Sequence, residues 1–270
     1  MKVLKVIDAL EQFAPLPLQE SYDNAGLQCG LTEADVSGAL LCLDVTESVV
    51  DEAMAKGCNL IVSHHPLIFH KLHCISDEDY VQRTVRKAVK NDIAIVSMHT
   101  NMDAAYGGVN FKIAEKLGLE DLHFLGKLKQ LEEKDTELPK HREGGEGVIG
   151  TFAEALAADD LVLMLRKQFD VECVECNQLL RREIRKVALC GGAGSFLLED
   201  AVAAGADAFI TGEMHYHEFF GYDQQIQICV IGHYQSEQFT KEIFRDIIEA
   251  KCPGVKCCLS EINTNPIIYL

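Results

Sequence analysis

Long apolar runs and basic residues are both scarce in this sequence of 270 residues. No apolar run approaches the roughly 18 residues that a membrane-spanning helix needs, so we do not expect a membrane protein. The 25 Lys and Arg residues are outnumbered by 42 Asp and Glu residues, which gives a net charge of −17. This charge repels phosphate backbones and argues against a nucleic-acid-binding surface.

The sequence also lacks the cysteine spacing of a disulfide framework. Its 11 cysteines are odd in number and lie mostly inside apolar runs such as "ALLCLD" and "QICVIG", which indicates reduced cysteines in a core. Cys173-x-x-Cys176 has no second pair, and its role stays open. The first residues, "MKVLKVIDALEQFAPLPLQE", carry acids in their middle and no small-residue cleavage site. We therefore expect no secretory signal and a cytoplasmic protein.

What the sequence does contain is a regular alternation of strand-like and helix-like segments. Apolar residues recur at helical spacing over 3–13, and strands are expected at 39–44, in "CNLIVS" and in "IAIVSM". The alternation resumes in the second half, where it includes an expected helix at 236–250. It predicts an α/β fold with largely parallel or mixed sheets and helices on their faces.

The charged stretch 127–147, "KLKQLEEKDTELPKHREGGEG", has little periodicity and is the expected linker. It separates a first half, 1–126, from a second half, 148–270, whose C-terminal segment could pack with the first. The segments "VVDEAMAKGCNLIVSHH" and "LLEDAVAAGADAFITGE" share one pattern: an acidic amphipathic helix, a glycine, a buried strand and polar residues at its end. Later strands end in "SMHTNMD" and "IGHYQSE". These matches predict an internal duplication.

Polar residues with metal-binding side chains gather at the ends of these strands. Because ligands collect at the carboxyl ends of strands in open α/β sheets, these residues are candidates for one site: His64, His65, His99, Asp103, Glu213, His233 and Glu237. Nitrogen and carboxylate donors without cysteine suit zinc, iron or manganese. Adjacent side chains on an extended backbone point apart, so His64 and His65 favour two ions bridged by a carboxylate.

The motifs "SYDNAGLQCG", "SHHP", "HTNMDAAYGGVN", "TGE" and "GHYQSE" occur in the order and spacing of the Nif-three-like family. Members of that family are often labelled GTP cyclohydrolase 1 type 2 homologues. The resemblance spans residues 20–240. It implies two similar, intertwined three-layer α/β/α domains, a homohexameric toroid and two divalent metal ions per subunit.

Carried over by motif, the resemblance implies that His64 and His233 bind one metal, that His65 and Asp103 bind the other, and that Glu237 bridges both. The chain departs from the family in having Tyr22 where relatives often carry Trp, and in lacking the inserted domain of longer members. The change at Tyr22 puts the details of any aromatic wall in doubt.

Other residues near these motifs keep two interpretations. His99, Glu213 and His217 are candidates for a general acid or base, or for orienting metal ligands, and the alternative is ordinary hydrogen bonding at strand ends. Asn101 has the same two interpretations. Asp23 and Asn24 could reach the site or only structure their own loop. The glycines of "CGGAGSF", 190–196, could bind phosphate, although a packing turn fits the sequence better.

A bridged metal pair lowers the pKa of a shared water and polarises a substrate atom, which predicts a hydrolase. The family label makes GTP the nominal substrate, with opening of the guanine imidazole ring and release of formate. The same centre would serve a phosphoesterase. A third alternative is a metal-binding or regulatory scaffold without turnover. The residues themselves do not separate these functions, and no protein partner other than further copies of the chain is indicated.

Overall fold

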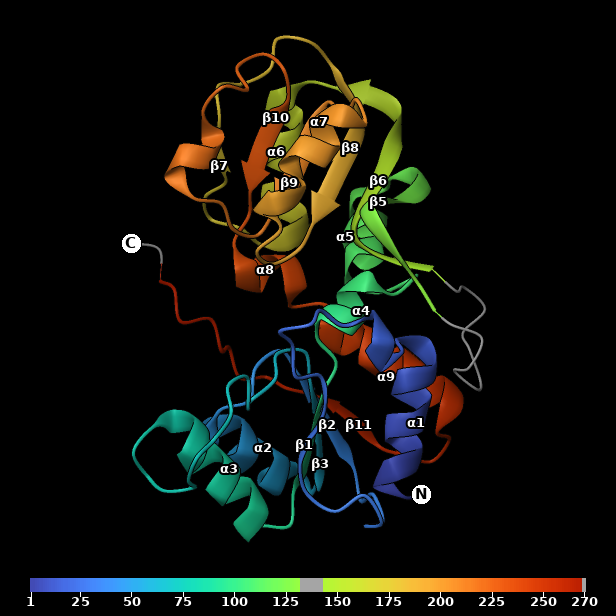
Figure 1. The fold of residues 1–270 in the computed structure, drawn as a ribbon, viewed down its shortest axis with the longest axis vertical. Helices are drawn as coiled ribbons and strands as arrows, with labels where there is room; N and C mark the ends of the chain where they lie inside the picture. The colour runs from blue at the N-terminus through green and yellow to red at the C-terminus, as the bar shows by residue number, and fades with distance from the viewer. Residues whose placement is uncertain (132–142, 269–270) are drawn as a thin grey trace. The chain divides into compact units, whose positions relative to one another are not determined.

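The computed structural model describes residues 1–131 and 143–268 (Figure 1). The chain divides into two compact units. Among the described residues, the first unit contains Met1–Ala105 and Phe239–Ile268, and the second contains Tyr106–Gln130 and Glu143–Gln238. The chain therefore leaves the first unit once and returns to it at its C-terminal end. Within the described ranges, no helix is both long and apolar enough to cross a membrane.

The first unit is built on a five-stranded sheet with the order β1-β4-β3-β2-β11. Strands β4, β3, β2 and β11 run parallel, and β1 is antiparallel to β4 at the edge. Buried aliphatic residues fill β2, β3 and β4, as expected for parallel strands that are covered on both faces. The strands are β1 (Gly26–Cys29), β2 (Ala39–Cys42), β3 (Leu60–Ser63), β4 (Ala94–Ser97) and β11 (Cys257–Leu259).

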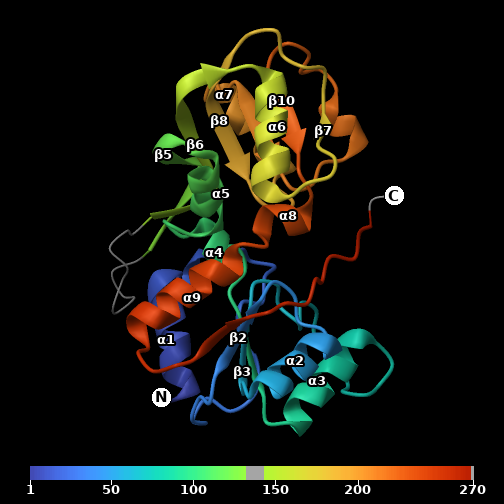
Figure 2. The same ribbon diagram turned by 180° about the vertical axis from the view of Figure 1, so that it is seen from behind.

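Helices cover both faces of this sheet (Figures 1 and 2). Helices α2 (Glu47–Lys56) and α3 (Tyr80–Lys90) pack on one face, and α1 (Val3–Phe13) and α9 (Thr240–Lys251) lie on the other. Local signals set the ends of α2: the Thr46 side chain accepts a hydrogen bond from the Val49 amide, and Gly57 ends the helix at a φ of 71°. The short η1 (Leu16–Leu18) precedes β1, and the short α4 (Thr100–Ala104), which contacts η1, follows β4.

The second unit contains a six-stranded sheet with the order β5-β6-β8-β9-β10-β7. Strands β8, β9 and β10 are parallel, whereas β5, β6 and β7 each pair in antiparallel fashion. The strands are β5 (Glu120–Gln130), β6 (Glu143–Leu156), β7 (Glu175–Cys176), β8 (Ile184–Cys190), β9 (Ala208–Thr211) and β10 (Gln227–Val230). Their buried faces again consist mainly of aliphatic residues.

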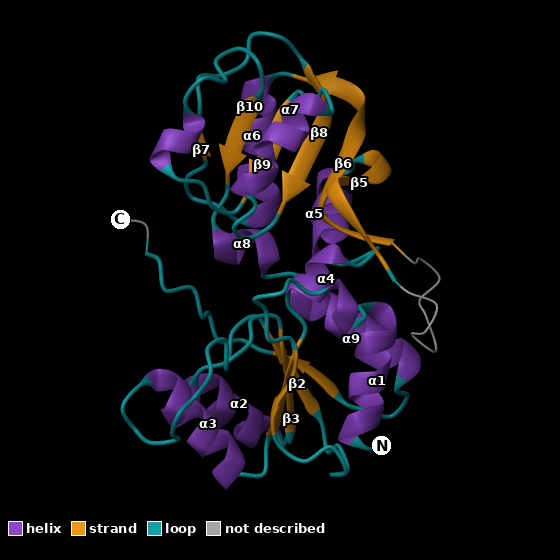
Figure 3. Ribbon diagram, viewed as in Figure 1, coloured by secondary structure: helices purple, strands orange, loops and turns teal. Residues whose placement is uncertain are grey.

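Helices also lie on both faces of the second sheet (Figure 3). Helices α5 (Val109–Leu117) and α6 (Ala158–Phe169) share one face, and α7 (Leu198–Ala203) packs on the opposite face with Phe209 and Ile228. Three short elements complete the unit: η2 (Ser195–Leu197), η3 (Tyr216–Phe219) and α8 (His233–Glu237). Each unit is thus a three-layer α/β/α structure.

The two units confirm the predicted duplication. The order β2-α2-β3 in the first corresponds to β8-α7-β9 in the second, and both strand pairs are parallel. The third parallel strand, β4 or β10, is followed in each unit by a short helix, α4 or α8, and is flanked by an antiparallel edge strand, β1 or β7. The polar ends of these strands are therefore equivalent places in one repeated fold.

Two features differ from the sequence-based expectations. The helix expected at 236–250 is two helices, α8 and α9, which are interrupted between Glu237 and Thr240. Of the expected linker, 132–142 lie outside the described residues, and the flanks belong to β5 and β6, which pair with each other. The charged composition concealed these strands because much of β5 is exposed and needs no apolar alternation.

Candidate metal centre

His64 and His65 directly follow β3, where the parallel strands of the first unit end. Their backbone amides both donate hydrogen bonds to the Leu43 carbonyl, at 3.1 and 3.0 Å. This shared acceptor fixes the turn after the strand, and Pro66 follows as a buried residue that cannot donate to the ladder. The His64 side chain is fully buried, whereas the His65 side chain is 22% exposed.

His99 and Asp103 come from the segment after β4. His99 is the N-cap residue of α4, and its carbonyl accepts from the amides of Met102 and Asp103. Asn101 anchors this segment: its side-chain oxygen accepts from the His99 amide at 2.9 Å, and its nitrogen donates to the Ala14 carbonyl at 2.7 Å. Asn101 is buried, so its contacts support a positioning role and not a ligand role.

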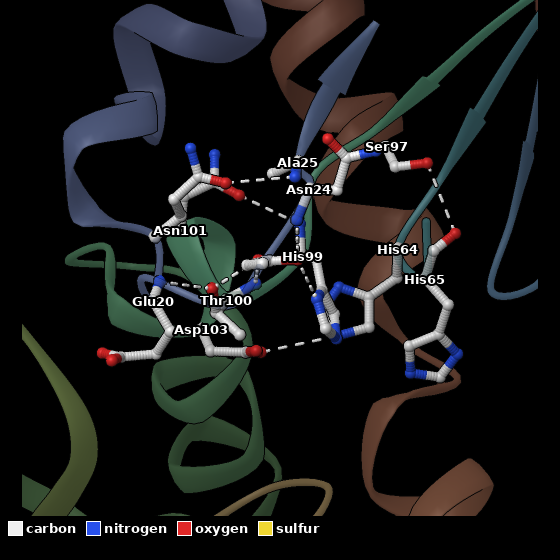
Figure 4. A network of polar contacts seen from close by, with 12 residues as sticks. Glu20, Asn24, Ala25, His64, His65, Ser97, His99, Thr100, Asn101 and Asp103 are labelled. Atoms are coloured by element: carbon white, nitrogen blue, oxygen red, sulfur yellow. Dashed lines mark hydrogen bonds and ion pairs between the residues drawn. The ribbon is translucent and has the colours of Figure 1, made fainter. Parts of the chain in front are cut away.

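The three histidines of the first unit form one cluster (Figure 4). Their ring centroids lie 4.9 Å apart for His64 and His65, 5.3 Å for His64 and His99, and 5.5 Å for His65 and His99. One nitrogen from each ring lies within 4.8 Å of the others, close enough to surround an ion. His64 Nε2 is 3.6 Å from Asp103 Oδ1, near the roughly 3.0–3.5 Å that separates two ligand atoms on one zinc ion. These two residues could therefore share one ion, which differs from the pairing implied by the motifs, where Asp103 shares its ion with His65.

The hydrogen bonds of the histidines leave the Nε2 atoms as the candidate ligand atoms. His64 Nδ1 lies 2.8 Å from the Met98 carbonyl oxygen, which can only accept, so Nδ1 carries the proton. His65 Nδ1 lies 2.7 Å from Asp44 Oδ1, and His99 Nδ1 lies 2.7 Å from Asp23 Oδ1. A metal-binding imidazole is usually oriented in this way, by an oxygen acceptor at the ring nitrogen that does not bind the metal.

The two supporting carboxylates are held in their charged form. Burial alone would raise the pKa of Asp23, but hydrogen bonds and charge from His99 and hydrogen bonds from Thr100 and Asn24 outweigh it and lower the pKa to about 2. Burial likewise opposes ionisation of Asp44, and the pKa is nevertheless lowered by His65 and by the Thr264 hydroxyl. Both residues are therefore acceptors at neutral pH, as the proposed histidine tautomers require.

The second unit carries its own donor set after β10. Gly232, at a φ of 92°, leads into α8, which begins with His233. His233 Nδ1 lies 2.9 Å from Glu213 Oε1, and His233 Nε2 lies 3.1 Å from Glu237 Oε2, one helical turn further on. Glu237 is only 5% exposed. The pair again matches the separation of two ligand atoms, with Glu213 as the orienting carboxylate.

The glycine-rich turn after β8 lies against Glu237. A Cβ atom at Gly192 would come within 2.3 Å of Glu237 Oε1, and the Gly192 amide donates to Ser236 Oγ at 3.0 Å. Ser236 Oγ in turn donates to the His233 carbonyl at 2.8 Å. The turn therefore positions the start of α8 and leaves room for the carboxylate, which favours the packing interpretation over a phosphate-binding loop.

A Gly192→Ala variant is expected to bind less metal than the wild type, because the added methyl group displaces the Glu237 carboxylate. Gly205→Ala is the matched control: Gly192 and Gly205 have φ values of 59° and 69°, but a Cβ at Gly205 meets nothing within 4 Å. Both variants should lose about 1 kcal/mol of stability from the left-handed backbone. Metal content after dialysis separates them, and equal retention would contradict the assigned role of the turn.

Glu213 hydrogen-bonds His233, so the structure gives it an orienting position, whereas its role as an acid or base stays a prediction. His217 lies in η3, with its ring centroid 5.2 Å from Tyr216 and 6.2 Å from Phe220, and its catalytic role also stays a prediction.

Cys176 in β7 faces Cys229 of β10, with 3.8 Å between the sulfur atoms. No pattern in the sequence predicted that partner or the role of Asp44.

Comparison with known proteins gives one family match and many relatives. A family model described as "Duf34/NIF3 (NGG1p interacting factor 3)" matches residues 1–266. A protein of Clostridium perfringens (strain 13 / Type A) named "GTP cyclohydrolase 1 type 2 homolog" is 33% identical over 238 residues, which cover 88% of this chain and 87% of that protein.

Solved structures of similar proteins extend the match to the fold. The crystal structure of Staphylococcus aureus hypothetical protein SA1388 gives a TM-score of 0.89 at 26% identity and covers 100% of this chain and 99% of that one. The structure of a Bacillus cereus protein related to NIF3 gives 0.87 at 25% identity, with the same coverage. The α/β/α architecture predicted from the resemblance is thereby confirmed.

Proposed function

The chain belongs to the Duf34/NIF3 family, and from that premise we propose that it is a divalent-metal-dependent hydrolase. The observation that carries the proposal is the set of contacts that the two ring nitrogens of its histidines make. In both units, an imidazole has Nδ1 held by an oxygen acceptor and Nε2 close to a carboxylate oxygen, as His64 has with Asp103 and His233 has with Glu237. The recurrence of this arrangement in both units supports a metal-binding role over a role in packing alone.

The proposed ligands are the five residues implied by the family motifs: His64, His65 and Asp103 of the first unit, and His233 and Glu237 of the second. In the family arrangement, they bind two ions per chain, with Glu237 as the bridge. The nitrogen and carboxylate donors suit zinc, iron or manganese better than calcium, which prefers more oxygen ligands.

When bound, the metal ions would supply Lewis acidity and lower the pKa of a water molecule. The chain itself would orient the imidazoles through Asp23, Asp44 and Glu213, whose carboxylates hold Nδ1 of His99, His65 and His233. His99 is close to His64 and His65, so in this proposal it either completes the ligand set or exchanges a proton with the substrate through Nε2.

We propose GTP as the first substrate to test, because the relatives carry the name GTP cyclohydrolase 1 type 2 homolog. The reaction would open the imidazole ring of guanine and release formate. Phosphoester hydrolysis is the second candidate, because histidine and carboxylate ligands around paired ions also stabilise the attacking and leaving oxygens of an in-line displacement. Metal storage or sensing without turnover is the third.

The deciding experiment measures metal content and turnover on the same preparation. Protein purified without chelator is analysed for zinc, iron and manganese, then assayed with GTP and with a generic phosphodiester after the same metals are restored. About two metals per chain with formate release from GTP would support the cyclohydrolase. Cleavage of the phosphodiester alone would favour the phosphoesterase, and tightly held metal without turnover would favour the scaffold. Protein without metal would contradict the ligand assignment.

The family resemblance also leads us to propose a homohexamer. Sedimentation equilibrium tests this directly, because the hexamer should have six times the 29.9 kDa mass of one chain. A species of one or two chains over the whole concentration range would contradict the proposal.

A further inference from the structure

Two aromatic side chains extend the histidine cluster of the first unit toward solvent. The ring centroid of Phe69 lies 6.1 Å from that of His99, and the ring of Tyr22 lies 6.4 Å from that of Phe69. Tyr22 is 65% exposed and Phe69 is 39% exposed. We call Tyr22 and Phe69 the aromatic wall. Sites for small ligands are lined mainly by apolar and aromatic side chains, with a few polar groups that fix the orientation of the ligand.

Hydrogen bonds tie together the two loops that carry the aromatic wall. Asn24 Nδ2 donates to the Ile68 carbonyl at 2.6 Å, and the Ile68 amide donates to Gln28 Oε1 at 3.0 Å. Gln28 Nε2 donates back to the Asn24 carbonyl at 2.7 Å. Residues close in sequence to Tyr22 and Phe69 are therefore joined, which restrains the two loops relative to each other.

The same loop also fixes the histidine beside the wall. Asp23, next to Tyr22, accepts from Thr100 Oγ1 at 2.5 Å and from the Thr100 amide at 3.1 Å, besides its contact with His99. One short segment thus sets the positions of an aromatic ring and of an imidazole. This accounts for the motif "SYDNAGLQCG", which the metal ligands alone leave unexplained.

We propose that the aromatic wall binds the planar heteroaromatic ring of a small-molecule substrate beside His99. The inference rests on the proposed function in one respect, that the adjoining histidines are the reactive site. Aromatic side chains bind planar rings through their faces and edges. A ring with its own nitrogen and oxygen atoms could also form hydrogen bonds with the histidine cluster, which a hydrocarbon ring could not. A purine base has both properties.

The chain contains no tryptophan, which gives a direct test of binding. A Tyr22→Trp variant carries one tryptophan on the wall, and its fluorescence is followed while guanosine 5′-monophosphate is added. Ribose 5-phosphate is the matched ligand without a base. Val89→Trp is the matched control protein: Val89 is exposed near the end of α3, just before β4 begins, whereas the wall adjoins the opposite, carboxyl ends of the strands.

The expected result is saturable quenching of Tyr22→Trp by guanosine 5′-monophosphate, without quenching by ribose 5-phosphate and without saturable quenching of Val89→Trp. A second substitution, Phe69→Leu in the Tyr22→Trp protein, keeps an apolar side chain but removes the ring, and should weaken binding about tenfold. Equal responses to both ligands, or an affinity unchanged by Phe69→Leu, would overturn the proposal.

A change that depends on protein concentration and not on the base would assign the wall to contacts between copies of the chain, and would also overturn the proposal. The readout does not require turnover. Saturable binding of the base without hydrolysis would leave the aromatic wall standing and reject the proposed function. Turnover of GTP without base-dependent quenching would do the reverse.

Discussion

A Glu237→Gln variant is expected to lose most of its bound metal while remaining folded. The side chain keeps its shape and one oxygen, but it loses the negative charge that a divalent ion requires from this nearly buried position. Residues that only support a ligand contribute about 10- to 100-fold to metal affinity. We therefore expect at least that loss for Glu237→Gln, with activity falling in parallel. Metal per chain after dialysis against buffers of fixed free zinc gives the affinity.

Two further variants show whether the loss of metal in Glu237→Gln is specific to this carboxylate. Glu199→Gln makes the same chemical change at an exposed glutamate of α7 and should leave metal content unchanged. His65→Ala should remove one of two metals if the family arrangement holds, whereas Glu237→Gln should weaken both. Glu237→Gln protein with an unchanged metal ratio would show that this carboxylate is not a ligand, and equal losses in Glu199→Gln would point to a general effect of charge.

Local features of the sequence predicted much of this fold. The periodicity of residues 3–13 coincides with α1, and Thr46 and Gly57 set the ends of α2 by capping that depends only on neighbouring residues. Strand ends could be predicted because buried aliphatic runs stop where polar residues begin. The break between α8 and α9 and the pairing of β5 with β6 were missed, because tertiary contacts decide them and periodicity does not.

The orienting carboxylates show a similar limit. Asp44 and His65 are 21 residues apart, and Asp23 and His99 are 76 apart. No spacing rule connects such pairs, although each acid lies in a segment that leads into or leaves a strand. The motif "SYDNAG" was visible in the sequence, but its function depends on a contact that only the folded chain makes.

The duplicated halves support their imidazoles differently. In the first unit, Asp23 comes from the loop before the antiparallel edge strand β1 and holds His99. In the second, Glu213 comes from the end of parallel strand β9 and holds His233. The strand end that supplies His64 and His65 in one half thus supplies an orienting carboxylate in the other. The repeated fold conserves the placement of polar strand ends, and the residue at each end decides the chemistry.

Asp23→Asn is expected to lower stability by about 2 kcal/mol at neutral pH, from the difference between a pKa of about 2 in the folded protein and 3.8 for an ordinary aspartate. The carboxylate accepts from His99 through one oxygen and from Thr100 through the other, whereas an amide has only one acceptor. Because the folded pKa is depressed, the contribution is complete above about pH 4.5, shrinks as the pH falls through 3.8 and disappears as the pH falls through about 2.

Urea unfolding of chelator-treated protein measures this difference without any contribution from metal. The gap between wild type and Asp23→Asn should stay constant from pH 7 to about pH 4.5 and shrink below it, while Asp77→Asn, at an exposed position of the same unit, should follow the wild type. Loss of orientation at His99 should also lower the proposed hydrolase activity of the metal-loaded protein about 10- to 100-fold. A stability gap with unchanged activity would confine Asp23 to holding the loop, and the absence of a gap at neutral pH would contradict the depressed pKa itself.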